Sequence, residues 1–271
     1  MRRVEDPDLV LAIVDDFSPI GAQEYQDGFR VFFATPTARD AAAIALGHKA
    51  TPVEVDDEDW AVRSQSDLLP ATIGRVTIVP SADFAASRSG ESTTDSSGPI
   101  SILIQPSMGF GTGHHATTRL CLLALQTIDL RRASVLDVGT GSGILAIAAT
   151  RLGAASALGL DADGDAIQSA DENLRLNPGV KNVRFVLSEL SDAPLPISDV
   201  VIANLTGSTL IRAAGPLQSA VARPGVLILS GILEGEEPDV RRAFDAMELQ
   251  HRDQESEWVC LEFNRKVSCL V

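Results

Sequence analysis

Cysteine is scarce in this chain. Its 271 residues include three cysteines, Cys121, Cys260 and Cys269, which lie in apolar segments and form no C-x-x-C pair. Buried thiols in a reducing compartment account for this usage, so we expect a cytoplasmic protein. Because no group of cysteines and histidines has the spacing of a zinc site, we predict no bound metal.

Long apolar runs are absent as well. No uninterrupted apolar segment reaches about 18 residues, the length that indicates a membrane-spanning helix. The N-terminal sequence MRRVEDPDLV has two arginines but reaches acidic residues before any apolar stretch. We therefore expect neither a membrane span nor a secretory signal.

Basic residues are outnumbered by acidic ones. The chain has 22 lysines and arginines against 37 aspartates and glutamates, for a net charge of −15. Binding to a phosphate backbone depends on clustered basic side chains, so we expect no direct readout of nucleic acid. The acidic balance is compatible with a basic partner such as a lysine-rich protein, although it serves solubility equally well.

The segment Ser134–Asp163 has the pattern of a βαβ unit. A short apolar run leads into three alternating glycines, Gly139, Gly141 and Gly143, where the backbone bends and lets a ligand come close. Apolar residues at helical spacing follow, and a second apolar run ends at Asp161. This arrangement predicts half of a nucleotide-binding fold.

Two carboxylates narrow the choice of nucleotide. Asp137 stands directly before the glycines, where it would repel a pyrophosphate and favour a cationic group. Asp161 ends the second strand, where a carboxylate can accept both hydroxyls of a ribose. The G-x-G-x-G spacing also differs from the G-x-G-x-x-G of dinucleotide sites. S-adenosylmethionine has a ribose, a positive centre and no phosphate, and we predict it as the ligand; an NAD-type site and an empty glycine turn are the alternatives.

The rest of the chain predicts a small module in front of a larger domain. Residues 1–56 read as a small α+β module, with strands at Phe29–Ala34 and Thr51–Val55 and a helix at Thr37–Leu46 capped by Thr37. Residues 57–99 read as a linker that contains a strand at Arg75–Pro80 and a polar loop at Ser87–Pro99.

Residues 100–271 alternate between strand and helix patterns. The helix candidates include 165–176, 210–221 and 239–247, and two strands, 249–256 and 257–265, close the chain. Such alternation predicts an α/β fold, a mostly parallel sheet with helices on both faces. The closing pair predicts an antiparallel strand at one edge of that sheet.

A second site signal precedes the glycine turn. The tract Gln105–Thr118 has three glycines, two histidines and three threonines, and leads into an amphipathic helix at Arg119–Leu125. It is too polar for a core segment, so we expect a ligand at the carboxyl edge of the sheet to order it. We favour hydrogen-bonding or surface roles over metal binding for the adjacent His114 and His115, which would point apart. Thr118 is a helix cap, a cofactor contact, or both.

Five motifs together resemble the bacterial methyltransferases that modify lysines of large-subunit ribosomal protein eleven. They are Met108–Leu122, the V-L-D-V-G-T-G-S-G-I-L-A-I-A-A run at 135–149, G-L-D-A-D at 159–163, Val201–Leu205 and Leu229–Leu233. The resemblance implies a class I S-adenosylmethionine-dependent methyltransferase fold, Rossmann-like, with a seven-stranded and mostly parallel sheet. It places cofactor contacts at Thr118, Gly139, Asp161 and Asn204. Asp137 and Gly141, read from the glycine turn itself, complete the predicted cofactor-binding set.

The chain departs from the family pattern in three places. His115 is followed by alanine where the family has proline, and Asn204 is followed by Leu-Thr-Gly in place of I-L-A. Thr206 and Gly207 are therefore expected to change the acceptor pocket. The N-terminal module is shorter by an initial strand than the substrate-recognition domain of the family, which leaves the identity of the substrate open.

The predicted function is transfer of methyl groups from S-adenosylmethionine to protein amines, chiefly of lysines and also of an N-terminus. Ribosomal protein eleven is the expected substrate; another protein lysine or a small molecule is the alternative. The main task is alignment of a neutral amine with the methyl group. No general base stands out, so we name no catalytic residue, and we expect a monomer. A rival hypothesis, a scaffold that binds the cofactor without catalysis, does not explain a complete site.

Overall fold

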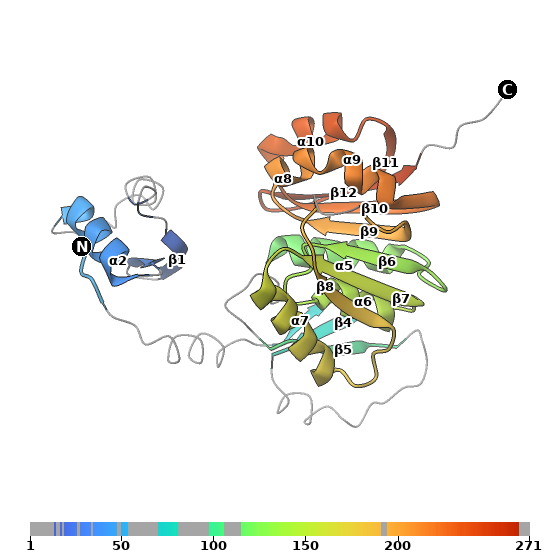
Figure 1. The fold of residues 1–271 in the computed structure, drawn as a ribbon, viewed down its shortest axis with the longest axis horizontal. Helices are drawn as coiled ribbons and strands as arrows, with labels where there is room; N and C mark the ends of the chain where they lie inside the picture. The colour runs from blue at the N-terminus through green and yellow to red at the C-terminus, as the bar shows by residue number, and fades with distance from the viewer. Residues whose placement is uncertain are drawn as a thin grey trace. The chain divides into compact units, whose positions relative to one another are not determined.

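A computed structural model describes residues 14, 17, 19–25, 28–33, 35–47, 50–53, 70–80, 98–105, 115–190 and 194–265. Contacts divide the chain into two compact units, Met1–Val62 and Arg63–Val271, and each is described by itself (Figure 1). No helix in these described ranges has the length and apolar character needed to cross a membrane.

The first unit contains a β-hairpin and a helix. Strand β1 (Pro19–Tyr25) pairs antiparallel with β2 (Gly28–Phe33), and Tyr25 lies opposite Gly28 at the turn. The sequence predicted β2 but not β1. Helix α2 (Pro36–Leu46) follows, as predicted.

The cap of α2 differs from the prediction. Thr35, not Thr37, is the N-cap, and its side chain accepts a hydrogen bond from the backbone N–H of Ala38 at 3.2 Å. Pro36 explains the shift, because proline favours the first helical position and thereby moves the cap to the residue before it. The strand predicted at 51–55 is wrong for residues 51–53, which lie outside helix and strand, and its last two residues fall outside the described ranges.

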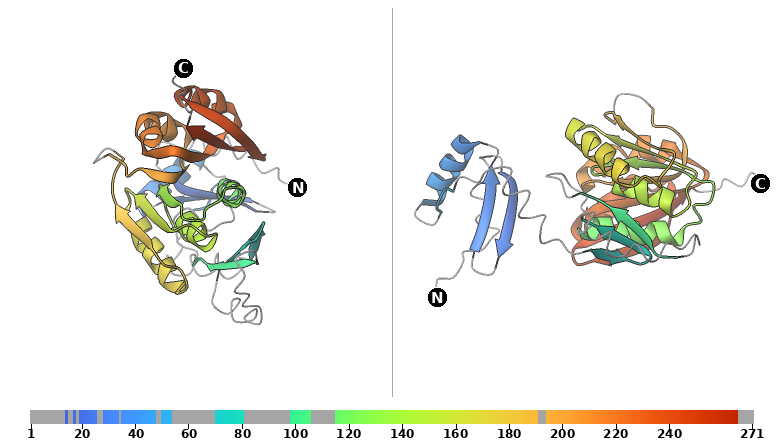
Figure 2. Two further views of the ribbon diagram at one scale, coloured as in Figure 1. Left: turned by 90° about the vertical axis from the view of Figure 1, so that its right-hand side faces the viewer. Right: turned by 90° about the horizontal axis from the view of Figure 1, so that it is seen from below.

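The second unit is built on a seven-stranded sheet with the order β11-β12-β10-β9-β6-β7-β8 (Figures 1 and 2). Its strands are β6 (Ser134–Val138), β7 (Ser156–Asp161), β8 (Val183–Leu187), β9 (Ser198–Asn204), β10 (Val221–Leu233), β11 (Met247–Glu255) and β12 (Trp258–Arg265). Neighbours from β8 to β10 pair in parallel, which confirms the predicted sheet. The reversed strand is β12, which pairs antiparallel with β10 and β11. The edge strand β11 therefore pairs antiparallel with its neighbour, as the closing pair predicted, and β12 lies one position inside the edge.

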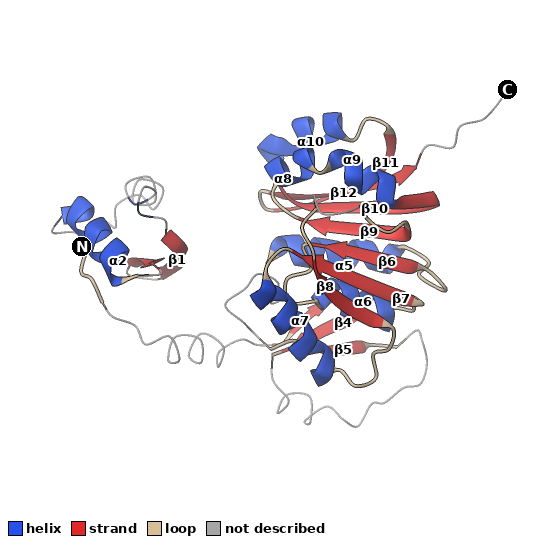
Figure 3. Ribbon diagram, in the orientation of Figure 1, coloured by secondary structure: helices blue, strands red, loops and turns tan. Residues whose placement is uncertain are grey.

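Helices cover both faces of this sheet (Figure 3). They are α5 (Ala116–Thr127), α6 (Ile144–Arg151), α7 (Gly164–Leu176), α8 (Gly207–Arg212), α9 (Ala214–Ala220) and α10 (Glu237–Ala243), with a short 3-10 turn η3 (Glu234–Glu236). One core cluster joins α5 and α6 to one face, and the other joins α8, α9 and α10 to the opposite face. Successive residues of β6 point to opposite faces of the sheet, so Val135 belongs to the first core cluster and Leu136 to the second. The helix predicted at 210–221 is in fact two helices that meet at Ala213.

A three-stranded sheet packs into the first core cluster. Strand β3 (Ala71–Ile73) pairs antiparallel with β4 (Val76–Val79), and β4 pairs in parallel with β5 (Ile100–Leu103). The sequence predicted β4 and missed the short β3. Most of the predicted polar loop at 87–99 lies outside the described residues. The domain ranges 1–56, 57–99 and 100–271, predicted from the sequence, remain a proposal. Their boundary at 99/100 separates β4 from its sheet partner β5.

Two of the cysteines are buried free thiols, as the sequence predicted. A hydrogen bond with Cys260, together with burial, raises the pKa of the Cys121 thiol. Cys269 lies outside the described residues.

Candidate functional site

The glycine turn after β6 adopts a backbone that only glycine takes easily. Gly139 and Gly141 have φ values of 72° and 52°, in the left-handed region. The backbone N–H groups of Gly139 and Thr140 donate to the carbonyl of Leu160, at 2.8 and 2.9 Å. A Cβ at residue 139 would lie 2.4 Å from the Cδ2 atom of Leu205. The turn is thus held against β7, and the Leu205 side chain packs where a side chain at position 139 would lie.

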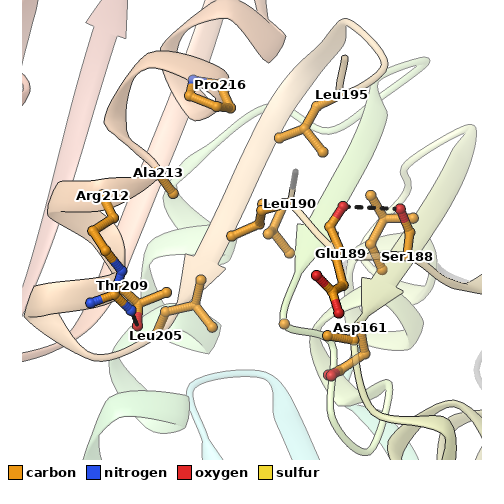
Figure 4. A pocket seen from close by; sticks show the side chains of 14 residues that line it. Asp161, Ser188, Glu189, Leu190, Leu195, Leu205, Thr209, Arg212, Ala213 and Pro216 are labelled. Carbon is orange, nitrogen blue, oxygen red and sulfur yellow. Dashed lines mark hydrogen bonds between the residues drawn. The ribbon is translucent and has the colours of Figure 1, made fainter. Parts of the chain in front are cut away.

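Asp161 connects the end of β7 to this turn. Its Oδ2 accepts a hydrogen bond from the backbone N–H of Gly141 at 2.9 Å, and its Oδ1 accepts one from Asp163 at 3.1 Å. An ionised carboxylate has about four lone-pair sites, so two further donors can still be accepted. Asp161 also lines the pocket in Figure 4. It is therefore placed both to fix the glycine turn and to bind a pair of hydroxyl groups.

Asp137 is a fully buried carboxylate below the turn. The Thr140 hydroxyl donates to its Oδ2 at 2.6 Å, whereas its Oδ1 has no hydrogen-bond partner in the described part of the chain. Burial raises the pKa of Asp137 to about 6, against the lowering effects of the Thr140 hydrogen bond and of the backbone N–H of Ala146. A buried carboxylate without full hydrogen bonding is destabilising, and a cationic group nearby would relieve that.

A pocket of about 540 Å³ opens beside these residues, at the carboxyl ends of the parallel strands (Figure 4). Its size lies within the range of roughly 300–1,000 Å³ typical of small-molecule sites. Two of the six predicted site residues, Gly139 and Asp161, line it. The sequence did not predict nine further lining residues, which come from the segments after β8 and β9: Ser188, Glu189, Leu190, Leu195, Leu205, Thr209, Arg212, Ala213 and Pro216. Apart from Leu205, which ends the motif Val201–Leu205, they belong to no motif, and only their position after strands that end at the same edge would have indicated them.

The charges in the pocket are divided between its two sides. Asp161 and Glu189 stand on one side and Arg212 stands on the other, with Leu190 between them and Leu195 above Leu190 (Figure 4). Leu205 also lies on the side of Arg212. The surface is therefore largely apolar, with a few polar groups at defined positions, as in sites that bind amphipathic ligands.

The other predicted residues lie around the pocket without lining it. Thr118 is in the first turn of α5 and is buried, and Asn204 is the last residue of β9, opposite Ser230 of β10. Gly141 is part of the glycine turn, and Asp137 of β6 is buried behind that turn. The alternative role of Thr118 as helix cap is wrong, because the N-cap of α5 is His115, whose side chain accepts from the N–H of Thr117.

Of the two adjacent histidines, the structure describes His115. His115 Nδ1 lies 2.7 Å from the Thr117 hydroxyl, and desolvation, followed by the charge of Arg119, lowers the pKa of His115. Its ring thus takes part in hydrogen bonding at the helix start, as the sequence predicted. His114 lies outside the described residues. Within the described ranges, no three histidine, cysteine or acidic side chains are grouped as a metal site.

The residues present fit S-adenosylmethionine. Asp161 can hold the ribose, and Gly139, which lines the pocket without a side chain, suits close approach of the methionine portion. Asp137, buried behind the glycine turn, adds a carboxylate that suits the positively charged end of this cofactor and opposes a phosphate.

Comparison with known proteins agrees with this site. The family model "Ribosomal protein L11 methyltransferase (PrmA)" matches residues 33–266. A ribosomal protein L11 methyltransferase of Geobacter sulfurreducens is 44% identical over 215 residues, which cover 78% of this chain and 68% of that protein. One from Geotalea uraniireducens is 35% identical over 280 residues, covering 97% and 85%. The crystal structure of ribosomal protein L11 methylase from Lactobacillus delbrueckii subsp. bulgaricus superposes with a TM-score of 0.62 at 28% identity, covering 74% of this chain and 99% of that one.

These matches confirm the resemblance seen in the motifs, the class I fold and the cofactor. The family model begins at the last residue of β2 and runs through the glycine turn and the closing strands, and so takes in every predicted site residue. The chain belongs to the family of ribosomal protein L11 methyltransferases, which use S-adenosylmethionine.

Proposed function

We propose that this protein methylates amino groups of ribosomal protein L11, chiefly lysine side chains and also its N-terminus. The observation that carries the proposal is the pocket at the carboxyl edge of the sheet, where Gly139 and Asp161 stand beside the buried and incompletely bonded Asp137. Because the fold alone serves many reactions, the site is what supports this one.

The six predicted residues have distinct proposed roles. Asp161 binds the ribose hydroxyls, Gly139 and Gly141 present backbone at the turn, and Asp137 stabilises positive charge. Thr118 of α5 and Asn204 at the end of β9 are proposed to lie near the methyl group of the cofactor. S-adenosylmethionine supplies a methyl group on a sulfonium, an already activated donor. The remaining task of the protein is to align a neutral amine with that methyl group.

We propose no acid or base catalyst for the amine. The acceptor lysine must lose its proton before it attacks, and desolvation against apolar side chains lowers the pKa of an ammonium group. Leu190, Leu195 and Leu205 supply such an apolar surface in the pocket. Loss of the proton to water on entry is therefore sufficient for the step.

The loop after Asn204 bears on the acceptor. A Cβ at Gly207 would lie 2.7 Å from Oε2 of Glu236, so an alanine there would require the Glu236 side chain to move. Glu236 itself accepts a hydrogen bond from the backbone N–H of Leu233 at 3.0 Å. Gly207 thus leaves room for the Glu236 carboxylate beside this loop. The negative charge of that carboxylate suits a lysine-bearing substrate.

The first unit is proposed to select the protein substrate, and we propose that the protein works as a monomer in the cytoplasm. A ribosomal protein is made and assembled there, and the two free buried thiols suit a reducing compartment. Light scattering during gel filtration checks the oligomeric state.

Transfer of tritiated methyl groups tests the proposed function. Purified protein is incubated with labelled S-adenosylmethionine and either purified ribosomal protein L11 or a cell lysate, and the labelled species are separated by size. Label on L11, located at lysines by mass spectrometry, supports the proposal. Label on another protein or only in small molecules would refute L11 as the substrate, and cofactor binding without transfer would indicate a scaffold.

A further inference from the structure

The start of α5 is held by residues that the cofactor site does not include. His115, the N-cap of this helix, packs its ring edge-on against Trp258, with centroids 5.0 Å apart and an interplanar angle of 67°. Trp258 is the first residue of β12. An aromatic contact of this kind fixes the relative position of the two rings.

An ion pair holds the same helix turn from a neighbouring strand. Arg119 Nε donates to both carboxylate oxygens of Glu255, at 3.0 and 3.1 Å, and its Nη2 also donates to Oε1. Glu255 ends β11, 136 residues further along the chain. A two-pronged pair of arginine and carboxylate is directional, so it restricts orientation as well as distance.

A third contact comes from β10. The Ser230 hydroxyl donates to the carbonyl of Thr117 at 3.3 Å, and both residues are buried. Three strands therefore hold the first turn of α5, and Thr118 lies inside that turn between the held positions 117 and 119. Of the described residues that line the cofactor pocket, none is His115, Arg119 or one of their partners Trp258 and Glu255.

We propose that His115, Arg119, Glu255 and Trp258, here called the α5 anchor, are positioning residues that set the affinity for S-adenosylmethionine through Thr118. This inference rests on the proposed function, in which Thr118 contacts the cofactor. The turn between β11 and β12 lies at the carboxyl edge of the sheet, because Trp258 pairs with Leu233 at the end of β10. The anchor thus couples the closing hairpin to the place where the cofactor binds.

Calorimetric titration of the full-length chain with S-adenosylmethionine tests the anchor. Trp258→Ala and Glu255→Gln are each expected to raise the dissociation constant roughly three- to tenfold, the scale of one aromatic or charged contact. Trp258→Phe retains a ring for His115 and is expected to restore the constant to within about twofold of the original protein.

Glu237→Gln is the matched control. Glu237 pairs with Arg252 of β11 at 2.8 Å, so the variant removes the same charge from an ion pair of the same strand, away from α5. We expect it to lower the melting temperature without changing the dissociation constant. The anchor is refuted if Trp258→Ala and Glu255→Gln both bind like the original protein, or if Glu237→Gln weakens binding equally. If the original protein binds no S-adenosylmethionine, the proposed function itself fails, which is a separate result.

Discussion

At the scale of single residues, Asp161 joins two tasks. It accepts hydrogen bonds from the backbone of Gly141 and Asp163 and faces the pocket. Replacement by alanine removes charge-assisted hydrogen bonds to the ribose and releases the glycine turn. We expect Asp161→Ala to weaken binding of S-adenosylmethionine by about 1.5–3 kcal/mol in a calorimetric titration.

Asp163→Ala is the control for that variant. Asp163 caps α7 by accepting from the N–H of Asp165 at 2.9 Å and is exposed. Its loss should lower the free energy of unfolding by about 1 kcal/mol and leave the affinity unchanged. Equal affinity of Asp161→Ala and the original protein would place the ribose elsewhere.

Asp137 predicts a pH dependence of stability. Its pKa in the folded protein is about 6, above the ordinary value of 3.8. A raised pKa means that its contribution to stability is complete below pH 3.8 and is lost as the pH rises through 6. At pH 8 the buried carboxylate is ionised and destabilises the cofactor-free protein.

Asp137→Asn should therefore stabilise the cofactor-free protein at pH 8 by about 1–3 kcal/mol and much less at pH 5. The amide oxygen can still accept the Thr140 hydroxyl, so the local packing is kept. The same variant should bind S-adenosylmethionine more weakly, because it lacks the charge. Urea unfolding at both pH values, with calorimetry, measures the two effects; a less stable protein at pH 8 would contradict the argument.

At the scale of elements, α7 links the small sheet to the glycine turn. Asn173 Oδ1 accepts from the N–H of Gln105 at 2.8 Å, and its Nδ2 donates to the carbonyl of Ser142 at 2.9 Å. Asn177 similarly pairs with both backbone groups of Leu103, at 3.0 and 2.7 Å. Asn173 of α7 and its C-cap Asn177 thus fix the end of β5 and the position of the glycine turn.

Asn173→Ala should lower the free energy of unfolding by about 2–3 kcal/mol, since it leaves buried backbone groups without partners. Gln168→Ala, on the exposed face of the same helix, is the control and should change it by less than about 0.5 kcal/mol. Urea denaturation gives both values. A similar small effect in the two variants would mean that water replaces the lost partners.

Local pattern was a good guide where one residue type had one physical use. The alternating glycines, the acids at strand ends and the apolar runs of β6 and β7 each follow from local geometry, and the structure confirms them. The pocket wall after β8 and β9 did not follow, because Leu190, Leu205 and Arg212 meet only through the parallel pairing of distant strands.

The same distinction explains the missed strand β3 and the unpredicted position of β12 in the sheet. The three residues of β3 are too few to show a period, and β12 lies inside β11 because of long-range pairing that no local signal encodes. The α5 anchor likewise joins residues 136 positions apart. Predictions from sequence fail here at the long-range contacts and not at the chemistry.

At the scale of the whole molecule, the two compact units predict separable functions. All six predicted cofactor residues lie in Arg63–Val271, and so does the pocket. A chain that begins at residue 63 should bind S-adenosylmethionine with a dissociation constant within about twofold of the full-length value, because it keeps every proposed contact.

Binding energy from parts of a protein substrate remote from the reacting amine contributes to turnover as well as to affinity. The shortened chain should therefore lose at least about a hundredfold in kcat/KM for ribosomal protein L11, the scale of roughly 3 kcal/mol of remote binding. Calorimetry and tritium transfer measure the two quantities on one preparation, and circular dichroism confirms that the shortened chain is folded. Undiminished methylation of L11 would show that the second unit recognises its substrate by itself.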